Sequence, residues 1–465
     1  MKWLSEQSIK QIVAVAAFAT IGMGVYHYSM QRDSVGKTAA NAGAPVADAH
    51  PTSNEIELYA PPHEAFSARL LDPMKQTDRA MAEADAKVRA APQSPAAYVE
   101  LSVVYMQKAR ETADAGYLLR AEAACQKSLS LHPGLYDAMQ VIPWIFNAQH
   151  RFDEAAVAAR AARDMIPADA WNYGTLGDAL LELGDYDGAR QAYDQMNAYQ
   201  PDSAALARVA RLREILGNPD GAIEAMNDAV EASRSDYPEH LAWALMQRGN
   251  FYFNTGRIDS ADADFTAALV AFTNYHLALA GLARVRMAEG RLAESEVLYR
   301  RALDVAPYQE TMVGLIDLLL HENRTADTTG LFALMEAIEK ILRASHVRPG
   351  WLLVQFWADH DLNLAEALQL ARQEATDRKD IKTMDALAWA SYKNQLYDEA
   401  ALASEQARRL GTHDALLYFH AGMIERKRGH APQAVALLKR ALEINPHFDV
   451  RHAPEAKEVL SELSP

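Results

Sequence analysis

Small and bulky apolar residues recur along most of the chain at a spacing of about 33 or 34 residues. The clearest unit begins at Ala170, taken as position 1, and contains the stretch WNYGTLGDALLELGDYDGARQAYDQMNAYQP. Bulky residues fall at positions 4, 7, 11 and 24, small residues at 8 and 20, and proline at 32: Tyr173, Leu176, Leu180, Tyr193, Gly177, Ala189 and Pro201. This spacing predicts two amphipathic helices, A and B, whose small residues allow close approach and whose end is set by the proline.

The same pattern continues in both directions and predicts ten units. They begin near residues 95, 136, 170, 203, 242, 276, 310, 348, 381 and 415. The first unit carries about seven extra residues between its helices, over 111–117, because Tyr105 and Ala121 lie too far apart. The units near 310 and 348 lack most signature residues, so their boundaries stay open. The segments DRAMAEADAKVRAAP and APEAKEVLSEL predict one capping helix at each end.

This spacing resembles the tetratricopeptide repeat (TPR), a helix-turn-helix unit of about 34 residues. The resemblance implies an all-α superhelical solenoid in which each unit buries its faces against its neighbours. The order of AEAACQKSL, GDALLELGDYDGA, GLARVRMAEGR, DALAWASY and GTHDALLYFHAGMI is also similar to a group of long bacterial TPR proteins without assigned biochemistry, over about residues 75–450. That likeness implies architecture rather than function.

A charge-free apolar run, IVAVAAFATIGMGVYHY at residues 12–28, predicts an N-terminal transmembrane helix within residues 1–30. A cleaved signal peptide is the alternative, with AFA at 17–19 as its small-residue site. Lys10 directly precedes the run and favours an N-terminus inside the cell. We therefore expect a single-pass protein of the bacterial inner membrane, bound to the lipid bilayer by this helix, whose body is periplasmic.

Residues 31–55 are rich in Ala, Gly, Pro, Ser and Thr, and a flexible linker is predicted over residues 31–73, with an ordered arm as the alternative. Residues 74–465 form the predicted solenoid. Half of all residues are hydrophobic, which supports a large core. The formal charge of −16 argues against nucleic acid as a partner, and the single cysteine, Cys125, excludes internal disulfides.

A second face of helix A, at positions 2, 5, 9 and 12, is predicted to line the concave groove, where TPR proteins usually bind peptides. Aromatic residues there supply large contact areas typical of binding hot spots. The alternative is that they pack against the neighbouring helix A as core. The predicted partner-binding residues are Trp144, Trp171, Asp178, Trp243, Asn250, Phe253, Phe356, Trp389, Tyr392 and Phe419; Asp359 and Arg426 share the face.

One TPR subset binds C-terminal carboxylates through lysine at position 5 and asparagine at position 9. Here Asn250 holds position 9, but Met246 holds position 5, and the next unit offers Ala280 and Arg284. The pattern is not met, so chaperone-tail binding is not predicted.

The sequence contains no Gly-rich phosphate loop, HExxH or GxSxG motif, so we expect neither an enzyme nor a cofactor. The alternative function is metal handling by Asp359, His360 and Asp361, with His346 nearby. Adjacent helical residues point about 100° apart, which disfavours a shared ion; His447 and His452 are discounted likewise. The main hypothesis is a membrane-anchored scaffold or assembly factor that captures a protein or peptide segment in its groove.

Overall fold

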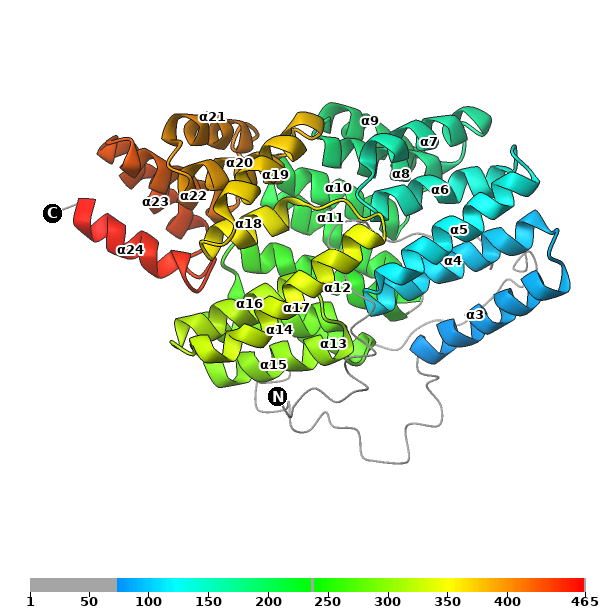
Figure 1. Cartoon of the computed structure of the whole chain (residues 1–465), viewed down its shortest axis with the longest axis horizontal. Coiled ribbons are helices and arrows are strands. Elements are labelled where there is room, and N and C mark those ends of the chain that lie inside the picture. Colours follow the sequence, from blue (N-terminus) through cyan, green and yellow to red (C-terminus); the bar gives the residue numbers. More distant parts are fainter. Residues whose placement is uncertain (1–72, 236–237, 464–465) are drawn as a thin grey trace.

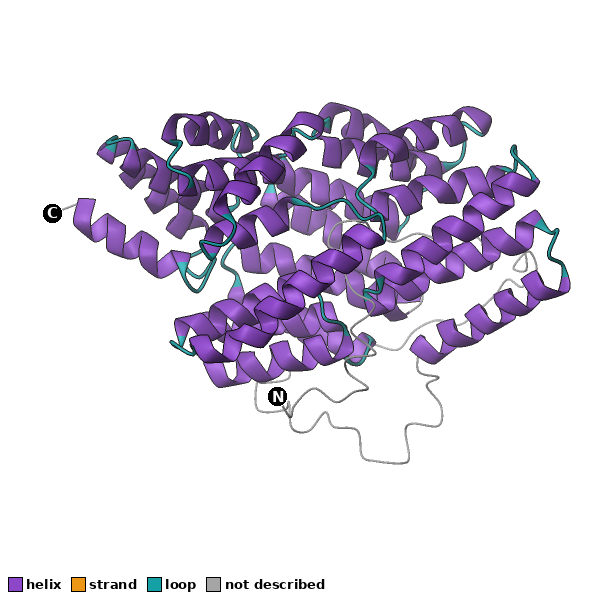
Figure 2. Ribbon diagram, viewed as in Figure 1, coloured by secondary structure: helices purple, strands orange, loops and turns teal. Residues whose placement is uncertain are grey.

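The computed structural model describes residues 73–235 and 238–463, and its regular elements there are all helices (Figure 2). Ten antiparallel pairs follow one another, which confirms the predicted all-α solenoid and the number of units. The pairs are α4 Pro95–Thr112 with α5 Ala115–Leu131, α6 Tyr136–Ala148 with α7 Phe152–Met165, α8 Ala170–Leu183 with α9 Tyr186–Tyr199, α10 Ser203–Ile215 with α11 Pro219–Ala232, α12 Pro238–Asn254 with α13 Ile258–Ala271, α14 His276–Ala288 with α15 Leu292–Val305, α16 Gln309–His321 with α17 Thr325–Ala344, α18 Trp351–Asp359 with α19 Leu364–Asp377, α20 Ile381–Lys393 with α21 Tyr397–Ala407, and α22 Ala415–Lys427 with α23 Ala431–Ile444. A short 3₁₀ helix, η2 Ser233–Ser235, precedes α12.

Single helices close both ends of the array. The helix α3, Pro73–Ala90, packs on α4, and α24, His452–Leu463, packs on α23. Both match the predicted caps. The two units without signature residues are the irregular ones, because α17 has 20 residues and α18 has only nine.

The first unit differs from its prediction. Its additional residues do not form an insertion between the helices but lengthen them, so that α4 has 18 residues and α5 has 17. Only Ala113 and Asp114 separate them. Ala113 adopts a left-handed conformation that ends α4, and the Asp114 side chain accepts a hydrogen bond from the Gly116 N–H to begin α5.

Within a unit, helices A and B interlock where the sequence places glycine opposite an aromatic ring. A Cβ atom on Gly177 would lie 2.3 Å from Cε1 of Tyr193, and one on Gly249 would lie 2.8 Å from Cε1 of Phe265. Both rings are almost fully buried. The small residue at position 8 therefore makes room for the large residue at position 24, as the spacing predicts.

The superhelix closes on itself after about six units of about 33 residues. Contacts between its early and late parts join residues 192 to 198 positions apart. The Ile381 N–H at the start of α20 accordingly donates to the Tyr186 hydroxyl at the start of α9, and in Figure 1 the gold helices α19 and α20 lie next to the teal α9, far from them in sequence. We call this line of contact the seam; its contacts join the ends of early helices A, or the turns that follow them, to segments that lead into later helices.

Backbone groups carry much of the seam. The Lys379 N–H donates to the Leu183 carbonyl at 3.0 Å, and the Arg348 N–H donates to the Gln149 carbonyl at 3.1 Å. Gly184 has a φ of 84°, and a Cβ atom there would lie 2.4 Å from the Lys379 carbonyl carbon. The seam therefore needs glycine at this turn for both conformation and space.

A buried ion pair reinforces the seam. Arg378 donates to Glu182 at 2.9 Å and lies 3.2 Å from Asp380, and its side chain is 6% exposed. A charge taken so far from water needs such partners to persist. The ion pair thus fixes the loop before α20 against the end of α8.

The predicted anchor (1–30) and all but the last residue of the predicted linker (31–73) lie outside the described residues. Among residues 73–235 and 238–463, no helix combines the length and hydrophobicity that crossing a bilayer requires.

Candidate functional site

Two adjoining cavities lie inside the superhelix. The first, of about 330 Å³, is lined mainly by α8, α10 and α12, and the second, of about 440 Å³, mainly by α12, α14, α16 and the segment leading into α24. Asn250, Arg284 and Glu310 line both. Each volume falls in the range that holds small ligands or parts of a larger one.

Several of the side chains that line the cavities occupy the same position in successive repeats. Asp178, Arg211, Asn250 and Arg284 each hold position 9 of helix A in four successive units. Position 9 belongs to the face predicted to be concave, and all four residues line a cavity. Trp243 at position 2 and Phe253 at position 12 also reach a cavity wall.

Most charges in the first cavity are paired. Arg208 makes a bidentate contact with Asp178, with Nε–Oδ1 at 2.8 Å and Nη2–Oδ2 at 2.7 Å. The Tyr193 hydroxyl donates to the same carboxylate at 3.0 Å, and burial together with Asp178 raises the Tyr193 pKa well above its ordinary value. The Asp178 carboxylate is therefore already bound by Arg208 and Tyr193 within the protein.

Two other cations that line the first cavity also form ion pairs. Arg211 pairs with Glu214, and Lys382 pairs with Asp414 while lying 5.6 Å from the centre of the Trp351 ring. Burial disfavours the charged form of Asp414, but Lys382 outweighs it and holds the Asp414 pKa below its usual value.

Arg284 differs from these residues. Its guanidinium lies 4.1 Å from the centre of the Phe253 ring and donates at 3.3 Å to the side-chain oxygens of Asn250 and Asn254. Among the described residues no carboxylate forms an ion pair with it, and burial lowers its pKa. Three of its five N–H groups are therefore left for another acceptor.

Glu310, near the start of α16, is the complementary case. Within the described part of the chain its carboxylate makes no hydrogen bond or ion pair. Burial raises its pKa, and Arg284, Lys382 and Arg211 act against that shift. Arg284 and Glu310 thus attract each other across the junction of the cavities without direct contact.

The predicted partner-binding residues divide into two sets. Five aromatic side chains are at most 3% exposed: Trp144, Phe253, Phe356, Trp389 and Phe419. The others are half-buried, namely Trp171, Trp243, Asn250 and Tyr392, or held in an ion pair, as Asp178 is. The binding role of all ten stays a prediction.

Packing between neighbouring helices A explains the buried set. The rings of Trp144 and Trp171, in successive units, meet edge to face with centroids 6.0 Å apart. Trp389 stacks with His420 of the next unit at 4.1 Å and with Tyr392 at 4.6 Å. These contacts correspond to the alternative that position 2 and 9 aromatics belong to the core.

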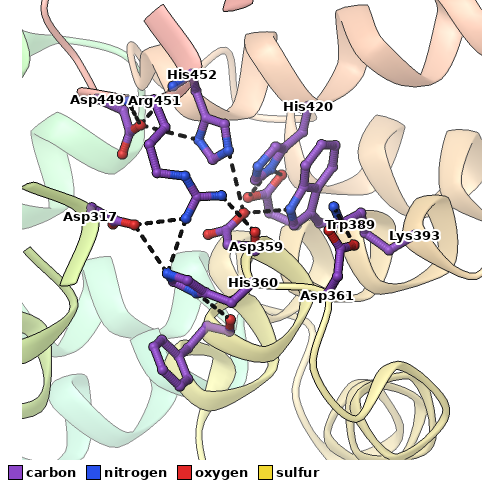
Figure 3. Close-up of polar contacts among 12 residues, drawn as sticks. Asp317, Asp359, His360, Asp361, Trp389, Lys393, His420, Asp449, Arg451 and His452 are labelled. Carbon is purple, nitrogen blue, oxygen red and sulfur yellow. Dashed lines mark hydrogen bonds and ion pairs between the residues drawn. The ribbon is translucent and has the colours of Figure 1, made fainter. Parts of the chain in front are cut away.

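Asp359, His360 and Asp361 point to different partners (Figure 3). Asp359 accepts the Trp389 Nε1–H at 2.7 Å, and Asp361 pairs with Lys393 at 2.7 Å. His360 Nε2 lies 3.1 Å from both Asp317 and Arg451. These three side chains therefore do not converge on one ion in this arrangement.

Arg451 joins this cluster to the C-terminal cap. Its Nη1 donates to Asp317 at 2.7 Å and its Nη2 to the Asp359 carbonyl at 2.6 Å. We call Asp317, Asp359, His360, Trp389, His420, Arg451 and His452 the cap cluster. Within residues 73–235 and 238–463, no three His, Cys, Asp or Glu side chains are placed to hold a metal, His346, His447 and His452 included.

Sequence reasoning did not single out Arg211, Lys382 or Glu310. The repeat numbering contains a signal for two of them, because Arg211 holds position 9 and Lys382 holds position 2 of their units. Glu310 begins a helix A, where an acidic residue is ordinary, so its position gives no such signal.

Comparison with known proteins agrees with the helical pairs. Models described as the tetratricopeptide repeat match residues 146–213 and 246–310. The chain contains tetratricopeptide repeats. The matched segments run from the end of α6 into α10 and from the middle of α12 to the start of α16, and they include most of the residues that line the first cavity and about half of those that line the second.

Similar proteins cover parts of the chain. Cellulose synthase 1 operon protein C of Komagataeibacter xylinus is 28% identical over 231 residues, which are 47% of this chain but only 16% of that protein. PilW, a type IV pilus biogenesis factor, is 14% identical over 45% of this chain and 99% of its own, with a TM-score of 0.37. A thermophilic TPR protein of Thermus thermophilus, TTC0263, is 25% identical over 40% of this chain and 99% of its own, with a TM-score of 0.34.

Proposed function

We propose that this TPR protein is a scaffold or assembly factor that binds a segment of a protein partner on the concave side of its superhelix. The observation that carries the proposal is the first cavity, where helix A residues of successive units, among them Arg211, Trp243, Gln247 and Asn250, present half-buried polar and aromatic surface. A long side chain from a partner could enter there and bury its apolar part against Trp243.

The chemistry of the cavity suits binding rather than turnover. The wall of the first cavity contains no Ser, Cys or His among the described residues, and most of its charged groups already form ion pairs. Nucleophilic catalysis needs a nucleophile within hydrogen-bond reach of a base. TPR proteins are generally scaffolds without enzymatic activity, which agrees with this proposal.

We further propose that residues 1–30 attach the protein to the bacterial inner membrane, with its body in the periplasm. The support is the apolar run at residues 12–28 and the preceding Lys10. Protease treatment of spheroplasts tests the side: digestion of the body in intact spheroplasts supports it, and digestion only after lysis contradicts it.

Site-specific photo-crosslinking in intact cells tests the binding proposal. A photoreactive amino acid replaces Gln247 in the first cavity, and a control replaces Val297, which is 65% exposed on α15. We expect one discrete adduct from position 247, weakened by Trp243→Ala, and none of the same mass from position 297. An adduct from position 297 alone, or one insensitive to Trp243→Ala, would contradict the concave site.

A further inference from the structure

One pair of opposite charges inside the superhelix has no structural explanation. Four cations and four anions line the first cavity: Arg208, Arg211, Arg284 and Lys382, and Asp178, Glu182, Glu214 and Glu310. Six of the eight form ion pairs, with each other or with Arg378 and Asp414. Among these described residues only Arg284 and Glu310 do not.

Keeping these two charges apart costs stability, because each loses part of its hydration without gaining an oppositely charged partner in direct contact. The surroundings do not bring them together. Asn250 and Asn254 hold the Arg284 guanidinium over the Phe253 ring, and Glu310 projects from the first turn of α16, a different helix. Sites prepared for a ligand commonly carry such a cost.

The charge balance limits the ligand that fits. With four positive and four negative side chains, the wall of the first cavity has no net charge, so a polyanion or polycation gains nothing from it. A molecule that carries both signs gains at both ends, because its carboxylate can meet the free N–H groups of Arg284 and its ammonium can meet Glu310.

The second cavity offers room for the remainder of such a molecule. Leu277, Met287 and Tyr308 line it together with Arg284 and Glu310, and its volume is about 440 Å³. Burying an apolar side chain against these residues adds to the affinity.

We propose that Arg284 and Glu310 bind a small zwitterion, a free amino acid or a short peptide, at the junction of the two cavities. Arg284 binds the carboxylate, Glu310 binds the ammonium group, and the second cavity holds the side chain. This site needs no protein partner, so it does not rest on the scaffold function.

Isothermal titration calorimetry on the purified protein tests the proposal. The probes are L-leucine and L-leucyl-L-leucine, each with its N-acetyl and its C-terminal amide derivative. We expect a zwitterionic probe to bind and each blocked derivative to bind at least about tenfold more weakly, since one charge-assisted contact is lost. The two probes separate a free amino acid from a peptide.

Variants locate the binding. Arg284→Gln and Glu310→Gln should each weaken it about tenfold or more, whereas Arg190→Gln, in an exposed pair with Asp187, should not change it. Circular dichroism confirms that each variant is folded. No binding of either zwitterion up to about 10 mM, equal binding of the blocked derivatives, or binding unchanged by both variants overturns the proposal. The crosslink from position 247 is scored separately, so the two proposals can fail independently.

Discussion

The cap cluster and the cavity junction are two groups of charged side chains on the inner side of the same superhelix, and they differ in how completely their charges are paired. In the cap cluster, Asp317 and Asp359 each have several partners, and Arg451 links two units to the C-terminal cap. At the cavity junction, Arg284 and Glu310 attract each other but form no ion pair or hydrogen bond with each other.

This difference indicates which group has a structural role. The charged groups of the cap cluster are paired, although among the described residues the buried Nε2 of His420 and Nδ1 of His452 have no hydrogen-bond partner. A buried network of paired charges stabilises one arrangement and is costly to break. An unpaired buried charge lowers stability and is retained only if something else benefits. We therefore expect substitutions in the cap cluster to destabilise the protein and substitutions at the junction to affect ligand binding instead.

Among these substitutions, Trp389→Ala should lower the free energy of unfolding the most. Trp389 is 3% exposed, stacks with two rings and donates to Asp359, so its removal should lower the free energy of unfolding by roughly 3–5 kcal/mol. Urea denaturation followed by circular dichroism measures this. Trp243→Ala is the matched control, because Trp243 is half-buried; an equal cost for both would remove the distinction between the two regions.

Arg451→Met should have a smaller effect. It keeps much of the apolar stem but removes the hydrogen bonds to Asp317 and to the Asp359 carbonyl, at a cost of roughly 2 kcal/mol. The loss should appear first as faster hydrogen exchange in α24. Unchanged exchange there would show that the cap is held by its apolar contacts alone.

The ion pair of His420 and Asp385 should make stability depend on pH. Burial lowers the His420 pKa, but Asp385 at 3.0 Å outweighs burial and the net pKa is raised. The stabilisation is therefore complete below the unfolded-state pKa of about 6.5 and is lost as pH rises through the higher folded-state value.

The difference in denaturation midpoint between wild type and Asp385→Asn isolates this effect. It should be largest near about pH 6 and shrink towards about pH 9. Taking this difference removes the opposite contributions of His150 and His276, whose pKa values burial lowers to about 4. A difference that is flat or grows with pH would mean that His420 is neutral in the fold.

Among these substitutions, Glu310→Gln is expected to change the free energy of unfolding least, and in the opposite direction from the others. Removing a half-buried carboxylate that has no ion-pair partner should leave stability unchanged or raise it by up to about 1 kcal/mol in the absence of ligand. The same urea titration measures it. A loss above about 1 kcal/mol would assign Glu310 a structural role like that of the cap cluster.

The sequence predicts the repeats well because their causes are local. The pairing of Gly177 with Tyr193, the ten units and the two caps follow from residues within one unit or in adjacent ones. The sequence predicts an insertion between the helices of the first unit, because the spacing of residues alone does not separate a longer helix from a longer loop. In the structure, Ala113 ends α4 and Asp114 begins α5, so the helices are longer and the loop between them is short.

The seam could not be predicted in the same way. It depends on a small rotation per unit that accumulates over nearly 200 residues, so no single repeat encodes it. Position 9 marks residues on the inner face, but whether that face is buried, as at Trp389, or lines a cavity, as at Arg284, depends on how the turns pack.

The most direct test of this arrangement is hydrogen–deuterium exchange at the Lys379 amide, resolved by electron-transfer fragmentation. Lys379 lies in a loop between helices, yet its N–H donates across the seam to Leu183, whereas Asn274 lies in a comparable loop without a backbone acceptor. If the superhelix is closed, the Lys379 amide should exchange at least about 100-fold more slowly than the Asn274 amide, after correction for intrinsic rates. Equal corrected rates would mean that the seam is open in solution, and would contradict the packing of the superhelix around the two cavities on which both binding proposals depend.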